Sequence, residues 1–121
     1  MRKESSASVR IFYPKFDKEE LIRKLKKRIE KLAGKLPLSS VVLFGSYAQG
    51  NYTVASDVDL FIVYKGKERE DAFATVKKTL DIPLLEPHVH SEAEYKRLKT
   101  VIDRMIADGV VLFSREEIEA T

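Results

Sequence analysis

Hydrophobic residues between Asp17 and Ala33 recur every three or four positions, which is the spacing of one buried helix face. Asp17 is a suitable N-cap residue for this helix, and Gly34 is a suitable residue at its end. The basic residues between the apolar ones are expected on the solvated face. The predicted inward positions are Leu21, Ile22, Leu25, Ile29 and Leu32.

Four short runs that are rich in apolar residues predict strands. Residues 41–44 are wholly apolar, which is typical of a strand that is covered on both faces. Residues 57–64 form the second predicted strand, and residues 83–90 form the third. A last apolar run at 110–113 predicts the fourth strand.

Helices are predicted between these strands. Residues 46–49 form a short helix, and residues 68–80 form a longer one. Ser91 and Glu94 have the spacing of a capping box, so a further helix is predicted from there to Asp108. The predicted inward positions of the two longer helices are Ala72, Phe73, Val76, Leu80, Tyr95, Leu98, Val101, Ile102, Met105 and Ile106.

The order of these elements predicts an α/β (α+β) fold in which helices pack on a small mixed sheet of about four strands. Residues 16–121 are predicted to form one domain, because no repeat, low-complexity tract or linker interrupts them. Residues 1–15 lack clear periodicity and are predicted to form a flexible arm or an edge strand that Pro14 ends. The tail from Ser114 to Thr121 can add one helical turn.

Composition narrows the class of protein. The 121 residues carry a net charge of only +3, and acidic and basic residues are interleaved along most of the chain. This mixture is typical of a solvated, ion-paired surface and disfavours nucleic acid as a partner. The absence of cysteine excludes a disulfide scaffold, a zinc-thiolate site and a cysteine nucleophile. Frequent Lys and Glu beside a single Gln and a single Asn predict a thermophilic source.

No apolar run approaches the roughly 20 residues that a helix needs to cross a bilayer. The polar residues 1–6 are followed by no apolar segment, so no signal peptide is expected. We therefore expect a cytoplasmic protein that does not bind a membrane. The oligomeric state stays open, and a homo-oligomer is one option.

The sharpest chemical feature is the pair Asp57 and Asp59 at the start of an apolar strand. Side chains alternate along a strand, so the two carboxylates project from the same face. Neighbouring carboxylates repel each other, and a bound divalent cation turns this repulsion into binding energy. Oxygen ligands favour Mg²⁺ or Mn²⁺ over zinc. Taken alone, the pair also fits a solvent-exposed strand end, where two Asp residues cost little.

Gly45 and Ser46 follow a buried strand at the start of a predicted helix. Such a turn presents backbone N–H groups and a hydroxyl to an anion, and glycine lets a phosphate approach the backbone closely. Taken alone, the turn also fits an ordinary strand-to-helix connection with a serine cap. The combination is more specific, because consecutive strands are usually neighbours and a metal that bridges carboxylates and phosphates needs both groups together.

Residues 45–50 read GSYAQG, and residues 56–60 read SDVDL. Together they resemble the signature of the DNA polymerase β-type nucleotidyltransferase superfamily. Within it, the chain is most similar to the minimal nucleotidyltransferase group of small prokaryotic proteins. The resemblance extends over residues 36–113 and implies a nucleotidyltransferase fold.

The resemblance also implies which residues of the turn hold the nucleotide. Gly45 and Ser46 are expected to hold the β- and γ-phosphates of a nucleoside triphosphate. Tyr47 and Ser56 line the same loop and are further candidates for nucleotide binding.

The same resemblance implies that Asp57 and Asp59 bind two Mg²⁺ ions. The family has a third carboxylate on the following strand, usually Asp, and Glu86 is the candidate for this catalytic and metal-binding position. Glutamate reaches one methylene further than aspartate and can still act as a ligand or base. His88 and His90 share the face of Glu86, but ligands at alternate positions of one strand diverge along about 13 Å. A metal site made by these three residues is therefore disfavoured, and His88 stays a candidate contact to substrate or phosphate.

The implied reaction is the transfer of a nucleoside monophosphate, AMP from ATP, to an acceptor hydroxyl. Proteins of the group that this chain resembles pair with HEPN-fold toxins and act as antitoxins that attach AMP to a toxin tyrosine. Two other functions stay open: a catalytically weak nucleotide-binding module that neutralises its partner by binding, and a nucleotidyltransferase acting on a small molecule or an RNA end.

Overall fold

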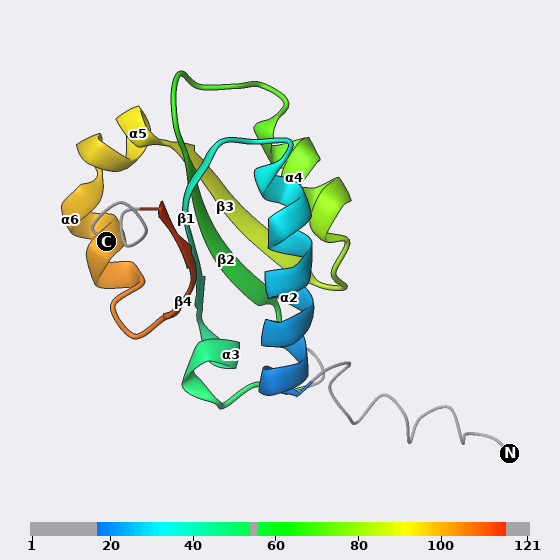
Figure 1. The fold of residues 1–121 in the computed structure, drawn as a ribbon. Coiled ribbons are helices and arrows are strands. Elements are labelled where there is room, and N and C mark those ends of the chain that lie inside the picture. Colours follow the sequence, from blue (N-terminus) through cyan, green and yellow to red (C-terminus); the bar gives the residue numbers. More distant parts are fainter. Residues whose placement is uncertain (1–16, 54–55, 116–121) are drawn as a thin grey trace, which may run out of the picture.

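The computed structural model describes residues 17–53 and 56–115. The elements are α2 (Lys18–Ala33), β1 (Leu38–Phe44), α3 (Ser46–Gln49), β2 (Val58–Tyr64), α4 (Ala72–Leu80), β3 (Leu85–Ser91), α5 (Glu92–Arg97), α6 (Lys99–Met105) and β4 (Val110–Ser114). A four-stranded sheet lies between two helical layers (Figure 1): α2 and α4 cover one face, and α5 and α6 cover part of the other.

The sheet is mixed, with the strand order β3-β2-β1-β4. Strand β1 is antiparallel to both β2 and β4, whereas β2 and β3 are parallel. The predicted fold class is therefore confirmed. Because β1 runs against β2, the end of β1 lies beside the start of β2, and Phe44 pairs with Asp59.

The main core lies between the sheet and the α2/α4 layer. The inward residues of α2 include Leu21, Leu25 and Leu32, each with no exposed surface, as its periodicity predicts. The Asp17 carboxylate accepts a hydrogen bond of 2.7 Å from the Glu20 N–H, which completes the N-terminal capping box. Burial of this apolar stripe is the main source of the stability of α2.

A smaller apolar cluster lies on the opposite face of the sheet. Val42, Phe61 and Val63 alternate outward from β1 and β2 and pack against Ile102 of α6. Tyr95 of α5 packs against the edge of this cluster. The cluster occupies the middle of the face, and Phe44 at the end of β1 packs against it.

The prediction of one continuous helix from Ser91 to Asp108 is wrong. Its start is as predicted, since Ser91 and Glu94 form the capping box, but the helix breaks at Leu98 into α5 and α6. A single helical period cannot be continued across such a break. Three of the residues predicted inward are therefore exposed: Leu98, Val101 and Met105.

The other differences lie at element ends. The helix predicted from residue 68 begins only at Ala72, because the Arg69 backbone N–H donates to the Tyr64 hydroxyl at 2.8 Å in the preceding turn. Phe73, predicted inward, is 52% exposed. Strand β1 begins at Leu38, earlier than the apolar run at 41–44, because the pairing with β2 continues through its polar serines.

Two predictions fall on residues outside the described part of the chain: the arm at 1–15 and most of the tail at 114–121. They stay predictions, as does the domain boundary at residue 16. Among the described residues, each helix is too short or too polar to span a membrane.

Candidate active site

The turn after β1 lies directly against the carboxylate of Asp59. Gly45 has a φ of +80°, in the left-handed region that favours glycine. A Cβ atom at this position would lie 2.4 Å from Oδ2 of Asp59. Such an atom cannot be accommodated without movement, so glycine is what allows the turn and the carboxylate to approach each other. The turn and β2 thus meet at one point, although thirteen residues separate Gly45 from Asp59.

Three carboxylates gather at the same end of the sheet. Asp59 lies near the start of β2 and pairs with Glu86 on β3, so their side chains share one face. Asp57 immediately precedes β2 and is exposed, as is Glu86, whereas Asp59 is half-buried. The three residues that the sequence singles out as acidic site residues are therefore brought to one edge.

Burial raises the pKa of Asp59 above its ordinary value, and the negative charges of Asp57 and Glu86 raise it further. His88 acts in the opposite direction and lowers the pKa of Asp59. In residues 17–53 and 56–115, no lysine or arginine forms an ion pair with any of the three carboxylates. The site therefore has a charge that a cation is suited to neutralise.

The donor atoms at this edge are carboxylate oxygens, the ligand type that Mg²⁺ prefers, so the residues fit magnesium by their chemistry. In the described part of the chain, no three His, Asp or Glu side chains are already gathered into a complete metal site. The side chains of Asp57 and Glu86 are exposed and have room to reorient.

The two histidines of β3 have different surroundings. His88 is exposed next to the carboxylates, with its ring 5.3 Å from that of Phe44. His90 lies further along β3, where its ring stacks on Phe61 at 5.2 Å. Its Nδ1 is 3.7 Å from the Glu94 carboxylate. His88 thus belongs to the carboxylate site, whereas His90 belongs to the start of α5.

The other two predicted nucleotide-binding residues have structural roles of their own. Tyr47 is 3% exposed and stacks on Tyr52 with 4.3 Å between ring centroids, so its ring lies in the core. Burial also raises the pKa of Tyr47. The Ser56 hydroxyl accepts a hydrogen bond of 2.8 Å from the Thr53 N–H, which closes the loop before Asp57. A contact between Tyr47 and a nucleotide is therefore restricted to its backbone.

Comparison with known proteins decides the family. The family model described as "Nucleotidyltransferase domain" matches residues 22–112, which is most of the chain. The chain belongs to this nucleotidyltransferase family. The predicted family and enzyme class are confirmed by this match, and the site described above lies within the matched residues of the nucleotidyltransferase domain.

Individual relatives agree with this assignment. A protein of Methanocaldococcus jannaschii, named "putative protein adenylyltransferase", is 48% identical over 46 residues, which are 38% of this nucleotidyltransferase and 46% of that protein. The match thus spans less than half of that relative's length.

Two solved structures share the fold. The crystal structure of a "putative nucleotidyltransferase" from Sulfolobus solfataricus has a TM-score of 0.57 at 25% identity, over 96% of this chain and 94% of that one. A crystal structure described as "the toxin-antitoxin with AMP-PNP" has a TM-score of 0.53 at 21% identity, over 74% of this chain and 73% of that one. The second match supports the fold alone.

Sequence reasoning missed the position of Phe44 and the effect of His88 on Asp59. The apolar run at 41–44 predicts only a buried strand for Phe44. In the structure Phe44 ends β1, and its ring faces His88 beside the carboxylates. Only the register of β1, β2 and β3 brings these residues together, and the register is not visible in local spacing.

Proposed function

We propose that this nucleotidyltransferase is magnesium-dependent and transfers AMP from ATP to an acceptor hydroxyl. The observation that carries the proposal is the contact between the Gly45 turn and Asp59, which joins a phosphate-binding type of turn to the acidic edge of the sheet. The family match supports the same chemistry. Triphosphate and carboxylates have to meet for nucleotidyl transfer, and this contact supports a site where both can bind.

Each residue of the edge has a role in this scheme. Gly45 and Ser46 hold the β- and γ-phosphates through backbone N–H groups and the serine hydroxyl. Asp57, Asp59 and Glu86 are the catalytic carboxylates and the ligands of magnesium. When bound, Mg²⁺ neutralises charge on the phosphates and lowers the pKa of the acceptor hydroxyl.

The bond changes at the α-phosphate follow from this arrangement. The acceptor oxygen forms a bond to the α-phosphorus, and the bond between the α- and β-phosphates breaks, so that pyrophosphate leaves. Glu86 is the general base that receives the proton of the acceptor hydroxyl. Its exposed position on β3, level with Asp59, leaves an acceptor room to approach from solvent.

For the acceptor, we propose a tyrosine of a partner protein, in an antitoxin role toward a HEPN-fold toxin. The motifs at residues 45–50 and 56–60 resemble those of antitoxins that attach AMP to a toxin tyrosine. The name of the Methanocaldococcus jannaschii relative supports a protein acceptor. The described residues form a single sheet with helices on its two faces. Within them, no second lobe faces Asp59. An acceptor surface supplied by a partner protein therefore suits the site.

One observation favours a second candidate, a module that binds nucleotide and a partner with weak turnover. Glu86 stands where the resembling family usually has Asp, and its side chain is exposed instead of being gathered with Asp59 into a complete site. Weak ATP binding without transfer to any acceptor would favour this candidate.

The test is a transfer assay with α-³²P-labelled ATP and Mg²⁺, run with and without the purified product of the neighbouring gene. We expect label on the partner protein and none after addition of EDTA. Label that appears instead on RNA or on a small molecule would replace the protein acceptor while keeping the enzymatic proposal.

The assay has a matched pair of variants. Asp57→Asn should abolish transfer, because it removes one carboxylate of the site. Asp71→Asn makes the same chemical change at an exposed residue that pairs with Arg69 at 3.0 Å, and it should leave transfer unchanged. Full transfer by the Asp57 variant would contradict the assignment of the carboxylates.

A further inference from the structure

We propose that a second pocket, at the opposite end of the same sheet face, binds a small phosphate-bearing anion. The pocket has a volume of about 480 Å³ and lies where β1 begins and β2 and β4 end, beside α5. Among the described residues, its lining contains four cationic side chains, Lys65, Lys96, Lys99 and Arg115, and one carboxylate, Glu92. This position is distinct from the carboxylate edge described above, and the inference does not depend on the proposed reaction.

The charge of the pocket is only partly neutralised from within. Lys99 is paired with Asp103 at 2.6 Å. Lys96 and Arg115, by contrast, form no ion pair with any residue of the described ranges, 17–53 and 56–115. Arg115 is anchored through its Nε, which donates to the Leu38 carbonyl at 3.0 Å. Two cations thus face the pocket without an acidic counterpart in the described chain.

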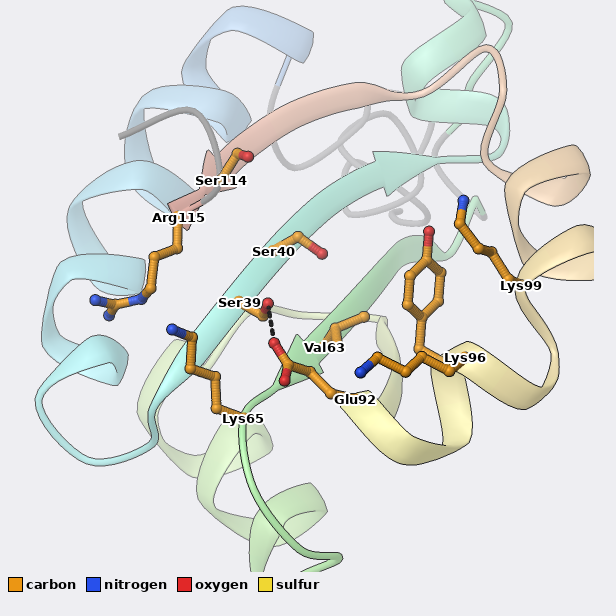
Figure 2. A pocket seen from close by; sticks show the side chains of 10 residues that line it. Ser39, Ser40, Val63, Lys65, Glu92, Lys96, Lys99, Ser114 and Arg115 are labelled. Carbon is orange, nitrogen blue, oxygen red and sulfur yellow. Dashed lines mark hydrogen bonds between the residues drawn. The ribbon is translucent and has the colours of Figure 1, made fainter. Parts of the chain in front are cut away.

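The carboxylate of Glu92 is held at the wall of the pocket. The Ser39 hydroxyl donates a hydrogen bond of 2.8 Å to Oε2 of Glu92. Figure 2 shows Lys65 and Lys96 on either side of this hydrogen bond. The Ser40 hydroxyl, which has no side-chain hydrogen bond in the described part, points into the same space (Figure 2). Ammonium groups and a hydroxyl together are donors that suit the oxygens of a phosphate.

The pocket is separated from the carboxylate edge by packed side chains. Val63 lines the pocket and lies four residues beyond Asp59 on β2, which corresponds to about 13 Å along the strand. Phe61 lies between them, 1% exposed, with the ring of His90 stacked on it. A phosphate in the pocket therefore makes its contacts apart from those that Gly45 and Ser46 offer.

The size and shape of the pocket favour a small ligand over an acidic peptide. Small-molecule sites typically enclose about 300–1,000 Å³, and this pocket falls in that range. An acidic peptide is better matched by an extended stripe of charge, whereas these cations line one hollow. The ligand chemistry is a phosphate or diphosphate group, and its two sources are an inorganic polyphosphate and a nucleoside monophosphate.

The test uses the 121-residue chain, labelled with ¹⁵N and titrated with inorganic pyrophosphate in the presence of EDTA. We expect amide shifts at Ser40, Val63 and Lys96, and a dissociation constant that calorimetry measures in parallel. A second titration with AMP distinguishes the sources: shifts at the same residues indicate a nucleoside monophosphate, and their absence indicates an inorganic polyphosphate.

Variants that change the charge of the pocket in opposite directions test whether pyrophosphate binds there. Lys96→Glu should weaken pyrophosphate binding about tenfold, because it removes a charge-assisted contact and adds repulsion. Glu92→Gln should tighten binding, because it removes a negative charge of the lining. Lys78→Glu makes the same charge change as Lys96→Glu, but on α4, on the other side of the sheet, and it should have little effect on binding.

Two outcomes would overturn the proposal. One is a set of shifts confined to Gly45 and Ser46, which would place pyrophosphate at the nucleotide end. The other is equal weakening by Lys96→Glu and Lys78→Glu, which would show only the loss of overall positive charge. Thermal melting of each variant checks that it is folded, and Lys96→Gln repeats the test without introducing an acid.

Discussion

The two ends of one sheet face carry opposite charge. At the end of β1 and the start of β2, Asp59 lies against the Gly45 turn, the charges of Asp57 and Glu86 act on it, and burial raises the pKa of Asp59. At the start of β1 and the end of β2, the described lining of a hollow contains four cations and one carboxylate. The same two strands therefore present an acidic edge and a basic pocket, separated by the apolar cluster around Phe61.

This difference shows that stability and ligand binding depend on different parts of the sheet face. The apolar cluster in the middle of the face is closed and supplies packing, whereas each end has charge that the described chain does not fully neutralise. An end with excess negative charge selects a cation, and an end with excess positive charge selects an anion. If the two ends are independent sites, a change at one should leave ligand binding at the other unaltered.

Among the variants that test the contrast between the two ends, the largest effect is expected from Asp59→Asn, which should reduce nucleotidyl transfer about a thousandfold. The variant keeps the size of the side chain but removes the carboxylate that Gly45 contacts. Its affinity for pyrophosphate at the basic pocket should equal that of the parent chain by calorimetry. Loss of both properties together would mean that the two ends are coupled and not separate.

The next effect concerns the third carboxylate. Glu86→Gln should lower transfer about a hundredfold if Glu86 is the general base, since such groups contribute on the order of 10²–10⁴ in rate. Glu86→Asp should retain most activity, because the carboxylate is kept at the usual family length. Transfer rates at saturating ATP measure both variants, and equal activity of Glu86→Gln and the parent chain would remove Glu86 from the mechanism.

The third prediction tests the contact between the turn and β2 through stability. Gly45→Ala should lower the free energy of unfolding by about 1–3 kcal/mol, because its φ is positive and its Cβ meets Asp59. Gly66→Ala is the control, with a φ of +89° but no atom within 4 Å of the added Cβ. Urea denaturation should show the larger loss for Gly45→Ala, and the excess measures the close approach itself.

Much of the fold was predictable because its signals are local. The stripe of α2, the capping box at Ser91 and the apolar runs of the strands each depend on a few neighbouring residues. The break at Leu98 was not predicted, because residues 91–108 keep an apolar pattern across it, and the phase of the helix changes without a glycine or proline to mark it.

The two charged ends of the sheet face also differ in whether the sequence predicts them. The acidic edge was predictable because Gly45, Ser46, Asp57 and Asp59 lie within one short segment whose spacing is informative. The basic pocket was not, because its residues come from β1, α5, α6 and the ends of β2 and β4, and they meet only in the folded chain. Lysines are frequent in this chain, so no pattern distinguishes Lys96 from the others.

The smallest effect is expected in the part of the pH dependence of stability that the ionisation of Asp59 causes. The pKa of Asp59 is raised in the folded chain, so the folded state holds this proton more tightly than the unfolded state does. Stability therefore falls as pH rises from the ordinary Asp value of 3.8 through the raised value, and the ionised side chain stays unfavourable above that window. Asp59→Asn removes this cost, because the amide carries no charge at any pH.

In EDTA at pH 7, Asp59→Asn should therefore melt about 2 °C higher than the parent chain, as expected for a modest electrostatic gain in a small domain. The difference should shrink to nothing below the ordinary pKa of aspartate, where both side chains are neutral. Differential scanning calorimetry across this range measures the difference directly, and comparing the two chains cancels the titration of every other group. A variant that melts lower at pH 7 would mean that a cation of the protein already compensates Asp59. In that case the acidic edge would not need a metal ion to offset its charge, and the contrast between the two ends of the sheet would lose its physical basis.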